Sequence, residues 1–454
     1  MRRLLIANRG EIAVRVIRAA RELDVATVLV VSEADTGSLG AQLADETVVI
    51  GPAPAQSSYL SPDAVLRAAR SSGADAVHPG YGFLSENADF AERVIGEGLT
   101  WVGAAPASIR LMGDKAQARA AAQAAGVPTV PGSGGALPPA GEIPADRLAA
   151  LAAEVGFPLL VKAAAGGGGR GIRRVDTAEE LSAAIAAAQG EALQAFGNAD
   201  VYVERFIERA RHVEVQVLGD GHEVVHLGDR DCTLQRRRQK LVEEAPAPGI
   251  PPHVRALLHD SAVALARSTH YVGAGTVEFL YDPAREEVSF IEMNTRLQVE
   301  HPVTEFVTGV DLVKEQLRIA DGQRLRFGQE EICFRGHSIE VRLNAEDPAN
   351  GFFPSPGTLE HFDLPGGPGV RVDSGFRAGA TVPPFYDSLL AKVVVHAEDR
   401  PAAVARALGA LAETRIDGVR TNLAFLSDLL RDETFSRHEH HTGHVETLLT
   451  GGPR

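Results

Sequence analysis

Apolar and polar positions alternate in blocks along the first part of the chain, and each block has the length of one strand or one helix. An apolar run at 4–7 precedes a segment whose apolar side chains recur every three or four positions, and a β-branched run follows at 27–31. These spacings predict a strand, a helix and a second strand. The rhythm continues with expected strands at 46–51, 74–80 and 99–103, and with helices near 61–71 and 86–97. Such alternation is typical of a small parallel α/β domain.

The pattern changes in the middle of the chain. An alanine-rich segment at 115–125 predicts a helix, and the Pro- and Gly-rich stretch after it indicates a domain boundary. Residues 133–205 are expected to form a compact unit. From about residue 206 the periodicity is that of strands: in 212–217 three polar side chains would lie on one face and three valines on the other.

A β-hairpin is predicted late in the chain, from strands at 273–281 and 288–300 with a turn at 282–287. If the hairpin is centred near Arg285, the register follows directly. The facing pairs would be Glu278 with Glu292, Val277 with Met293, and Phe279 with Ile291.

Two carboxylates face each other in this register, which is unfavourable for like charges. A divalent cation between Glu278 and Glu292 would remove the conflict, and Asn294 adds an oxygen on the same face. Oxygen ligands of this kind suit Mg²⁺ that carries substrate phosphates. The hairpin therefore predicts a metal site, with a solvated acidic face as the alternative.

A glycine-rich segment, LLVKAAAGGGGRG at 159–171, follows another expected strand. It is not the usual P-loop, because Lys162 precedes the glycines and no Ser or Thr follows Gly171. The residues alone leave two alternatives, a surface linker or a different cover for nucleotide phosphates. Further along, Arg296 and Glu300 could supply an anion clamp and a general base.

Composition narrows the class of protein. The 454 residues can form two or three domains, and 44% hydrophobic with 23% charged residues is typical of a globular chain. Cys232 and Cys333 are too few and too far apart for a disulfide framework or a cysteine metal site. We expect a cytoplasmic protein without a membrane span. A net charge of −15 argues against nucleic acid as the main partner.

Lysine is scarce among the 45 basic residues. A chain that accepts Arg in most places is expected to keep Lys where a compact ammonium is needed. The five lysines are Lys115, Lys162, Lys240, Lys314 and Lys392. Lys240, together with Arg296, Glu300 and the glycine-rich segment, suggests a phosphoryl-transfer site for a small anion.

Many short motifs then occur in one order along the chain. They are IANRGEIAVR (6–15), DAVHPGYGFLSEN (75–87), RLMGDK (110–115), RDC (230–232), QKLVEEAPAPGI (239–250), FIEMNTRLQVEHPVTE (290–305), RLNAEDP (342–348) and YDSLLAK (386–392). On these motifs the chain resembles the biotin carboxylase family over essentially its full length. The resemblance implies an ATP-grasp fold with three domains. These are an N-terminal Rossmann-like α/β domain (1–114), an ATP-grasp domain (115–321) whose glycine-loop lid is 133–205, and a C-terminal mixed α+β domain (322–454).

The resemblance also implies the roles of site residues. The glycine-rich segment would close over the nucleotide phosphates, which settles the alternative left open above. Matching positions for the nucleotide are Lys115, Lys162, Gly167, Gly168, Gly169, Glu204, Ile207, His212 and Gln235. Those for bicarbonate are Lys240, Arg296, Gln298, Val299 and Glu300. Glu278, Glu292 and Asn294 match the metal ligands, and Arg342 matches an arginine beside biotin.

The implied activity is that of an ATP-dependent ligase, which carboxylates biotin with bicarbonate through carboxyphosphate. ATP and Mg²⁺ (or Mn²⁺) would be needed, and biotin would arrive on a carrier protein or domain. This is the first half-reaction of an acyl-CoA carboxylase, as in fatty acid biosynthesis, with a carboxyltransferase and a second copy of the chain as further partners. The sequence offers no Met-Lys-Met biotinylation site, because its only methionines are Met1, Met112 and Met293.

Other interpretations remain at this stage. The chain could be a different ATP-grasp carboxylate ligase, a non-catalytic regulator on the same fold, or the N-terminal part of a longer acyl-CoA or pyruvate carboxylase. Three positions depart from the family pattern: Ala165 replaces a glycine of the loop, Arg205 a common lysine, and Arg238 a common histidine.

Overall fold

The computed structural model describes residues 1–163, 172–196 and 198–451. Gly167, Gly168, Gly169 and Ala165, all named above, lie outside these residues. The described residues include no helix long and apolar enough to cross a membrane.

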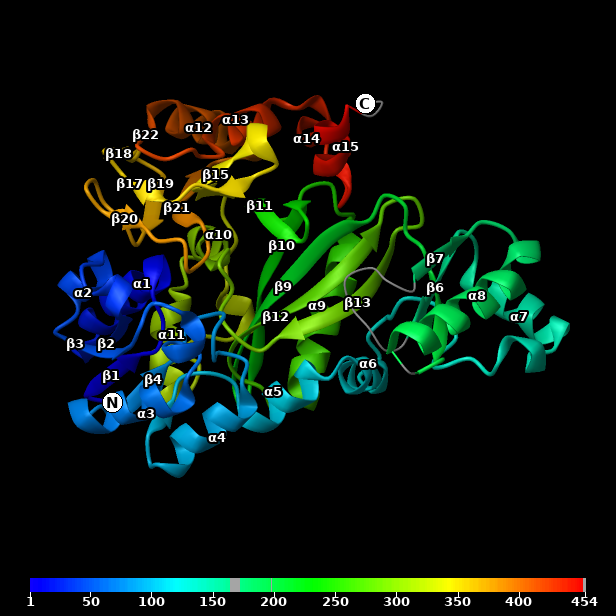
Figure 1. Cartoon of the computed structure of the whole chain (residues 1–454), viewed down its shortest axis with the longest axis horizontal. Helices are drawn as coiled ribbons and strands as arrows, with labels where there is room; N and C mark the ends of the chain where they lie inside the picture. The colour runs from blue at the N-terminus through cyan, green and yellow to red at the C-terminus, as the bar shows by residue number, and fades with distance from the viewer. Residues whose placement is uncertain (164–171, 197, 452–454) are drawn as a thin grey trace.

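The N-terminal part is a parallel sheet with helices packed against it (Figure 1). The strand order is β3-β2-β1-β4-β5. The strands are β1 (Arg3–Ile6), β2 (Ala26–Ser32), β3 (Glu46–Gly51), β4 (Ala76–His78) and β5 (Thr100–Trp101). The helices are α1 (Gly10–Arg21), α2 (Leu39–Leu43), α3 (Pro62–Ser72), α4 (Ala88–Gly96) and α5 (Pro106–Gly113). The prediction of a small parallel α/β domain is confirmed, although β4 and β5 are shorter than expected.

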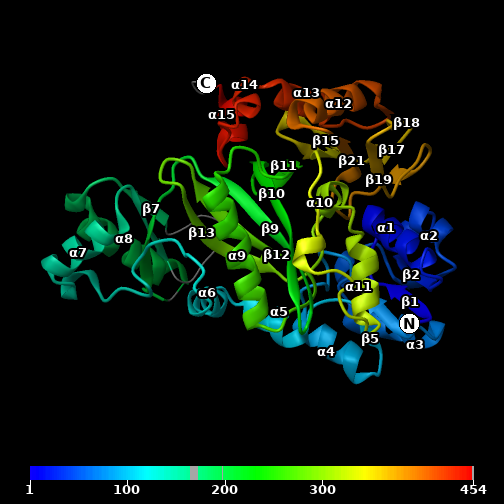
Figure 2. The same ribbon diagram turned by 180° about the vertical axis from the view of Figure 1, so that it is seen from behind.

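A second unit projects from one end of the molecule (Figures 1 and 2). It follows α6 (Lys115–Ala124) and contains a small antiparallel sheet in the order β7-β6-β8. Its elements are α7 (Ala145–Val155), β6 (Leu159–Ala163), β7 (Ile172–Val175), α8 (Ala178–Phe196) and β8 (Val201–Arg205). Side chains from Leu137 to Val203 form a hydrophobic core within this unit. Such a core is what the predicted compact unit at 133–205 requires.

The central element is an eight-stranded sheet in the order β13-β12-β9-β10-β11-β14-β21-β19, in which neighbours are antiparallel. Its strands are β9 (Arg211–Asp220), β10 (Val224–Arg236), β11 (Gln239–Ala245), β12 (Val272–Asp282), β13 (Glu287–Asn294), β14 (His337–Asn344), β19 (Val370–Ser374) and β21 (Leu389–Ala397). Helix α9 (Pro252–Ser268) packs against β9 and β10, and is seen in front of the sheet in Figure 2. Helices α10 (His301–Thr308) and α11 (Leu312–Ala320) follow β13.

The C-terminal residues complete this sheet and cover its far end. The helices there are α12 (Arg400–Glu413), α13 (Leu423–Arg431), α14 (Glu433–Ser436) and α15 (His444–Thr450). Three short strand pairs accompany them: β15 (Glu346–Asp347) with β16 (Phe353–Pro354), β17 (Gly357–Thr358) with β20 (Thr381–Val382), and β18 (His361–Asp363) with β22 (Arg415–Asp417). One continuous sheet therefore spans the expected boundary near residue 321.

The alternation predicted for 212–217 is present in β9, where Val213, Val215 and Val217 belong to a hydrophobic core. The opposite face, with His212 and Glu214, is buried as well. Burial of polar side chains without contacts would be costly, so this face must hold a network of hydrogen bonds and ion pairs.

The predicted hairpin register is confirmed for Glu278 with Glu292, which lie directly opposite each other, and for Val277 with Met293. It is wrong for the next pair: Phe279 lies opposite Phe290, because the register shifts by one residue after Glu278. A bulge of this kind leaves one residue unpaired, and Ile291 is 38% exposed. The strand also ends at Asn294, so residues 295–300 are not the continuation that was expected.

Candidate active site

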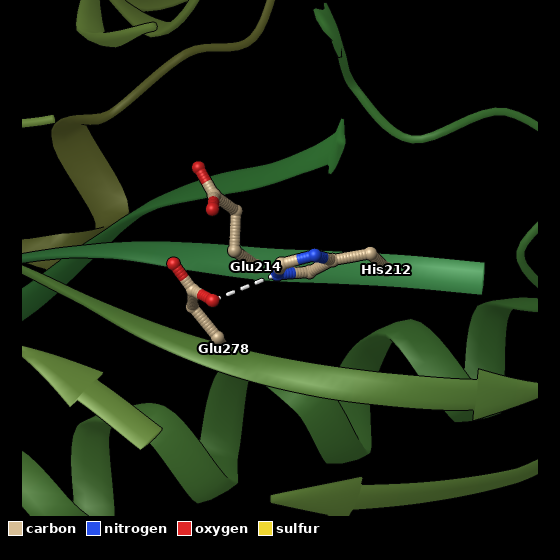
Figure 3. A group of neighbouring side chains, drawn as sticks. All are labelled: His212, Glu214 and Glu278. Carbon is tan, nitrogen blue, oxygen red and sulfur yellow. Dashed lines mark ion pairs between the residues drawn. The ribbon is translucent and has the colours of Figure 1, made fainter. Parts of the chain in front are cut away.

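Glu278 lies on the polar face of β12 and is surrounded by hydrogen-bond donors. Asn294 Nδ2 donates to its Oε1 at 2.7 Å and Gln298 Nε2 at 3.2 Å. His212 Nε2 lies 2.9 Å from the other oxygen (Figure 3). Burial alone would raise the pKa of Glu278, but Lys240 and His212 outweigh it and lower the pKa to about 2. Glu278 is therefore a carboxylate that carries its charge.

Glu292 faces Glu278 from β13 and differs from it in environment. Burial and the nearby Glu278 charge raise the pKa of Glu292, whereas Lys115 lowers it. Glu292, Asn294 and Lys115 line one cavity of about 200 Å³ beside α5 and α6. Two carboxylates and an amide oxygen on neighbouring strands are the donor set that a hard cation prefers. Glu292 and Asn294 line one cavity and Glu278 lies directly opposite Glu292, so these residues fit a divalent cation.

Glu300 is the centre of a second group, immediately before α10. It is fully buried, and its Oε1 lies 2.5 Å from Lys240 Nζ. Its Oε2 accepts a 2.8 Å hydrogen bond from Arg342 Nη2 on β14. Burial would raise the pKa of Glu300, but Lys240, Arg342 and Arg230 hold it well below its usual value. In this arrangement Glu300 is ionised and can become a stronger base only when these cations contact another anion.

Arg296 lies in the segment between β13 and Glu300, where a strand had been expected. Its guanidinium bonds Glu86 at 2.8 Å, Gln298 Oε1 at 2.7 Å and Asn294 Oδ1 at 3.0 Å. It therefore touches the same Asn294 that bonds Glu278.

Lys162 and Glu204 form a separate pair in the projecting unit. Lys162 Nζ on β6 lies 2.7 Å from Glu204 Oε2 on β8, and Arg119 bonds the other oxygen at 2.8 Å. Ile207 follows β8 and Gln235 lies near the end of β10, where it is opposite Lys240. Contacts thus join Lys240, Arg296, Glu300 and Arg342 in one network with Glu278. Lys162 and Glu204 pair elsewhere, in the projecting unit.

Two of the residues that depart from the family pattern, Arg205 and Arg238, can be placed in the structure. Arg205 Nη1 bonds Glu287 at 2.6 Å, so its charge is already paired. Arg238 lies in the tight turn between β10 and β11, with a positive φ of 67°. Such a φ is uncommon for a residue other than glycine.

Several site residues had no role assigned from the sequence. Glu214 is fully buried on β9 and bonds Lys240 at 2.7 Å and Arg230 at 2.6 Å. Figure 3 shows it beside His212 and Glu278. Its place on the polar face of 212–217 was the available signal. Arg230 and Cys232 belong to the RDC motif, and Cys232 Sγ lies 3.8 Å from Glu300 Oε1.

A further cavity of about 180 Å³ lies between the N-terminal sheet and the C-terminal residues. It is lined by Asn8, Glu11, Tyr81, Phe83 and Asp387, among others. Tyr81 donates a hydrogen bond to Glu11. Burial is the largest cause that raises the pKa of Tyr81; Glu11 and Asp387 raise it further, while Arg342 lowers it.

The site, with a buried carboxylate between a lysine and an arginine, and the fold around it match those of ATP-grasp ligases. Family models match three successive parts of the chain, namely "Biotin carboxylase, N-terminal domain" at 1–109, "Carbamoyl-phosphate synthase L chain, ATP binding domain" at 114–327, and "Biotin carboxylase C-terminal domain" at 340–447. The chain belongs to the biotin carboxylase family, whose members are ATP-dependent ligases.

Relatives and solved structures agree with this assignment. The chain is 54% identical to biotin carboxylase of Pseudomonas aeruginosa over 96% of both chains, and 50% identical to biotin carboxylase 1 of Bacillus subtilis over 98% of both. Its fold is similar to the biotin carboxylase domain of a thermophilic 2-oxoglutarate carboxylase bound to bicarbonate, with a TM-score of 0.91, 44% identity, and 98% and 97% of the two chains covered. It is also similar to a Campylobacter jejuni biotin carboxylase in complex with β,γ-ATP, with a TM-score of 0.87, 43% identity and 98% coverage of both chains.

Proposed function

We propose that the chain carboxylates biotin with ATP and bicarbonate, through carboxyphosphate, as the first half-reaction of a biotin-dependent carboxylase. The observation that carries the proposal is Glu300, held between Lys240 at 2.5 Å and Arg342 at 2.8 Å. This arrangement places a base between two cations that can each hold an anion or a developing negative charge.

Bicarbonate binds against Lys240 and Arg296, with Gln298 and Val299 completing the site. Both cations now contact internal carboxylates, Lys240 with Glu300 and Arg296 with Glu86. When bicarbonate takes over part of these contacts, the pKa of Glu300 rises toward its ordinary value, because the cations that lower it are shared. Glu300 then takes the bicarbonate proton, and the resulting carbonate oxygen attacks the γ-phosphorus of ATP, which releases ADP and yields carboxyphosphate.

The nucleotide lies between the projecting unit and the central sheet. Lys162 and Lys115 contact its phosphates, Glu204 and the backbone near Ile207 contact adenine, and His212 and Gln235 line the site. Glu278, Glu292 and Asn294 would hold Mg²⁺ or Mn²⁺, and the bound ion would neutralise the phosphate charge that accumulates during phosphoryl transfer. Gly167, Gly168 and Gly169 are proposed to cover the phosphates, where backbone N–H groups can approach an anion closely.

Biotin binds beside Arg342, in the cavity bordered by Tyr81 and Asp387. Carboxyphosphate breaks into CO₂ and phosphate within the closed site, and that phosphate removes the ureido N1 proton of biotin. The charge then lies on the ureido oxygen, where Arg342 stabilises it, and N1 attacks CO₂. A closed site protects the labile intermediate from water.

The partners follow from this half-reaction. We propose a biotin carrier protein or domain, a carboxyltransferase that takes up the carboxyl group, and a homodimer in the cytoplasm. The biotin carboxylase domain of 2-oxoglutarate carboxylase has been solved as a dimer. A further solved relative, 45% identical to the chain, is the biotin carboxylase component of a pyruvate carboxylase. These two relatives carboxylate different acceptors, 2-oxoglutarate and pyruvate, according to their names. For this chain we propose an acyl-CoA as the final acceptor.

One assay separates the proposal from its alternatives. ADP formation is measured with the full chain in four mixtures: ATP and Mg²⁺ alone, with bicarbonate, with biotin, and with both. We expect bicarbonate-dependent ADP formation that biotin increases, together with ¹⁴C transfer from bicarbonate to biotin. ADP formation that ignores both additions would indicate another ATP-grasp ligase, and the absence of any turnover would indicate a regulator.

A further inference from the structure

Lys392 is a fully buried lysine that no role assigned above uses. It lies on β21 with no exposed surface, although the chain carries arginine at most of its 45 basic positions. A buried ammonium must be paired or hydrogen-bonded, or its burial would cost several kcal/mol. The contacts of Lys392 therefore indicate what it is kept for.

Its ammonium makes contacts with three separate parts of the fold. Lys392 Nζ donates a 2.9 Å hydrogen bond to the carbonyl oxygen of Val299, the residue before Glu300. It also lies 3.1 Å from Glu11 on α1 and 3.8 Å from Asp373 on β19. The Asp373 carboxylate is bonded in addition by Arg371 at 2.7 Å. One ammonium thus joins the N-terminal domain, the C-terminal residues and the segment that carries the proposed base.

The neighbouring carbonyl of that segment is also held. His301 Nδ1 lies 2.7 Å from the carbonyl oxygen of Gln298. Burial, with Lys392 and Arg15, holds the pKa of His301 well below its usual value, so the ring is neutral and donates through this nitrogen. The two carbonyls before Glu300 are therefore fixed by two different buried donors.

Lys392 is also related directly to Arg342. The two residues are paired across β14 and β21 in the antiparallel register, so their side chains leave the sheet on the same face. Around Lys392 the charged groups are Glu11 from α1, Asp373 and Arg371 from β19, and Glu340 and Arg342 from β14. Lys392 is thus the cross-strand neighbour of Arg342 and at the same time holds the backbone just before Glu300.

We propose that Lys392 is a positioning residue that fixes the Val299–Glu300 backbone relative to Arg342, and so holds the bicarbonate site in its productive geometry. This inference rests on the proposed function of Glu300 and Val299. Lysine suits the task better than arginine, because its ammonium has three donors that point in separate directions, whereas a guanidinium is a flat fork.

The test is a double-mutant cycle of Lys392→Met, Glu11→Gln and the double variant in the full chain. Removal of Lys392 alone leaves Glu11 short of a positive partner and can impair folding, whereas the double variant removes both charges. We expect Lys392→Met to raise the KM for bicarbonate about tenfold, as the loss of one buried charged hydrogen bond would. The KM for ATP should stay within about twofold. The double variant should show the same rise relative to Glu11→Gln.

Two outcomes would overturn the proposal. If the double variant has the bicarbonate KM of Glu11→Gln, Lys392 only balances charge and the proposal is overturned. Lys392→Arg, which keeps the charge, should recover stability but not the bicarbonate KM; full recovery would also contradict the proposal. Lys314→Met serves as the control, because Lys314 pairs with Glu22 at the surface. A wild-type chain without bicarbonate-dependent ADP formation would instead refute the proposed function itself.

Discussion

Arg342 donates a 2.8 Å hydrogen bond to Glu300, so the arginine assigned to biotin and the base assigned to bicarbonate are in direct contact. Arg342 also pairs with the buried Glu243. Although burial opposes it, Glu243 and Glu300 raise the pKa of Arg342, which therefore stays charged. Two carboxylates for one guanidinium leave Arg342 able to lose one partner and face the biotin oxygen without becoming unpaired.

Replacement of Arg342 by Ala should lower biotin carboxylation by at least ~10²-fold, the scale of one lost electrostatic stabiliser. ATP affinity should be nearly unchanged, because the nucleotide candidates Lys162 and Glu204 lie in the projecting unit. The pKa of Glu300 should rise, since one of the cations that lower it is gone. The measurements are ¹⁴C incorporation into biotin and the Kd of a fluorescent ATP analogue.

The control for this variant is Arg415→Ala. Arg415 forms an ion pair with Asp417 on the surface of the C-terminal part, and its side chain is 61% exposed. It should change neither quantity. If nucleotide affinity falls together with the rate in Arg342→Ala, the assignment of Arg342 to biotin is wrong.

Replacement of Glu292 by Gln should raise the Mg²⁺ concentration needed for turnover or abolish turnover. Glu292 lies directly opposite Glu278. Burial is the main cause that raises the pKa of Glu292, and the charge of Glu278 is the second. Loss of one of two facing charges should therefore stabilise the metal-free protein slightly, by roughly 0.2–1 kcal/mol. Mg²⁺ titration of ADP formation and urea unfolding in EDTA provide the two measurements.

Glu286→Gln is the matched comparison, since Glu286 lies in the turn between the same two strands and its side chain is 52% exposed. It should leave both the Mg²⁺ requirement and the stability unchanged. A Glu292→Gln protein that is markedly less stable in EDTA would instead assign this carboxylate to a structural ion pair.

The facing of Glu278 and Glu292 could be predicted because the residue alternation and the turn length fix a hairpin register. The bulge after Glu278 could not, because Phe279 fits its neighbours equally well opposite Ile291 or Phe290 in an apolar pattern. The end of β13 at Asn294 was missed for a related reason. The segment 295–300 alternates like a strand, but its polar side chains are held by Glu86 and by residues of β11, β12 and β14, most of them far away in sequence.

Contacts between distant strands explain the other gaps. Glu214 was visible as a polar position of an alternating strand, but its partners Arg230 and Lys240 come from two other strands. Lys392 was visible as a rare lysine, yet its contact with Val299 joins residues 93 positions apart. A single sequence shows which residue types are unusual for a place in a strand; only the order of the strands in the sheet shows what they touch.

The free energy of unfolding should depend on pH because of the raised pKa of Glu243. It is fully buried on β11, directly opposite Glu340 on β14. Burial raises the pKa of Glu243 from 4.5 to about 7, although Arg342 lowers it. Between these pH values the folded protein keeps a proton that the unfolded chain has released. Rising pH therefore lowers the free energy of unfolding in this window, by up to ~1.4 kcal/mol per pH unit.

Glu243→Gln removes this titration. Urea unfolding between pH 5 and 8 should show the variant gaining stability relative to the wild type as pH rises through the window, with no further change above it. Glu439→Gln, which replaces a surface carboxylate, should follow the wild type at every pH. A difference between Glu243→Gln and wild type that does not depend on pH would mean that Glu243 is ionised in the folded protein throughout.

The dependence on a carrier gives the last prediction. None of the five lysines lies between methionines, as the lysine of a Met-Lys-Met biotinylation site would. We therefore expect biotin to be supplied by another domain or protein, and expect the chain to carboxylate unattached biotin with a weak apparent affinity. Unattached biotin gains nothing from protein–protein contact, whereas a carrier that docks on the chain presents biotin at a high effective concentration.

Addition of a biotinylated carrier domain in trans should therefore raise kcat/KM well above the value for unattached biotin, while ADP formation stays dependent on bicarbonate. The same carrier without biotin is the control, and it should neither support ¹⁴C transfer nor raise ADP formation. Equal kcat/KM values for the carrier and for unattached biotin would show that carrier contacts contribute nothing. In that case the binding site for biotin on this chain alone would determine how biotin is recognised.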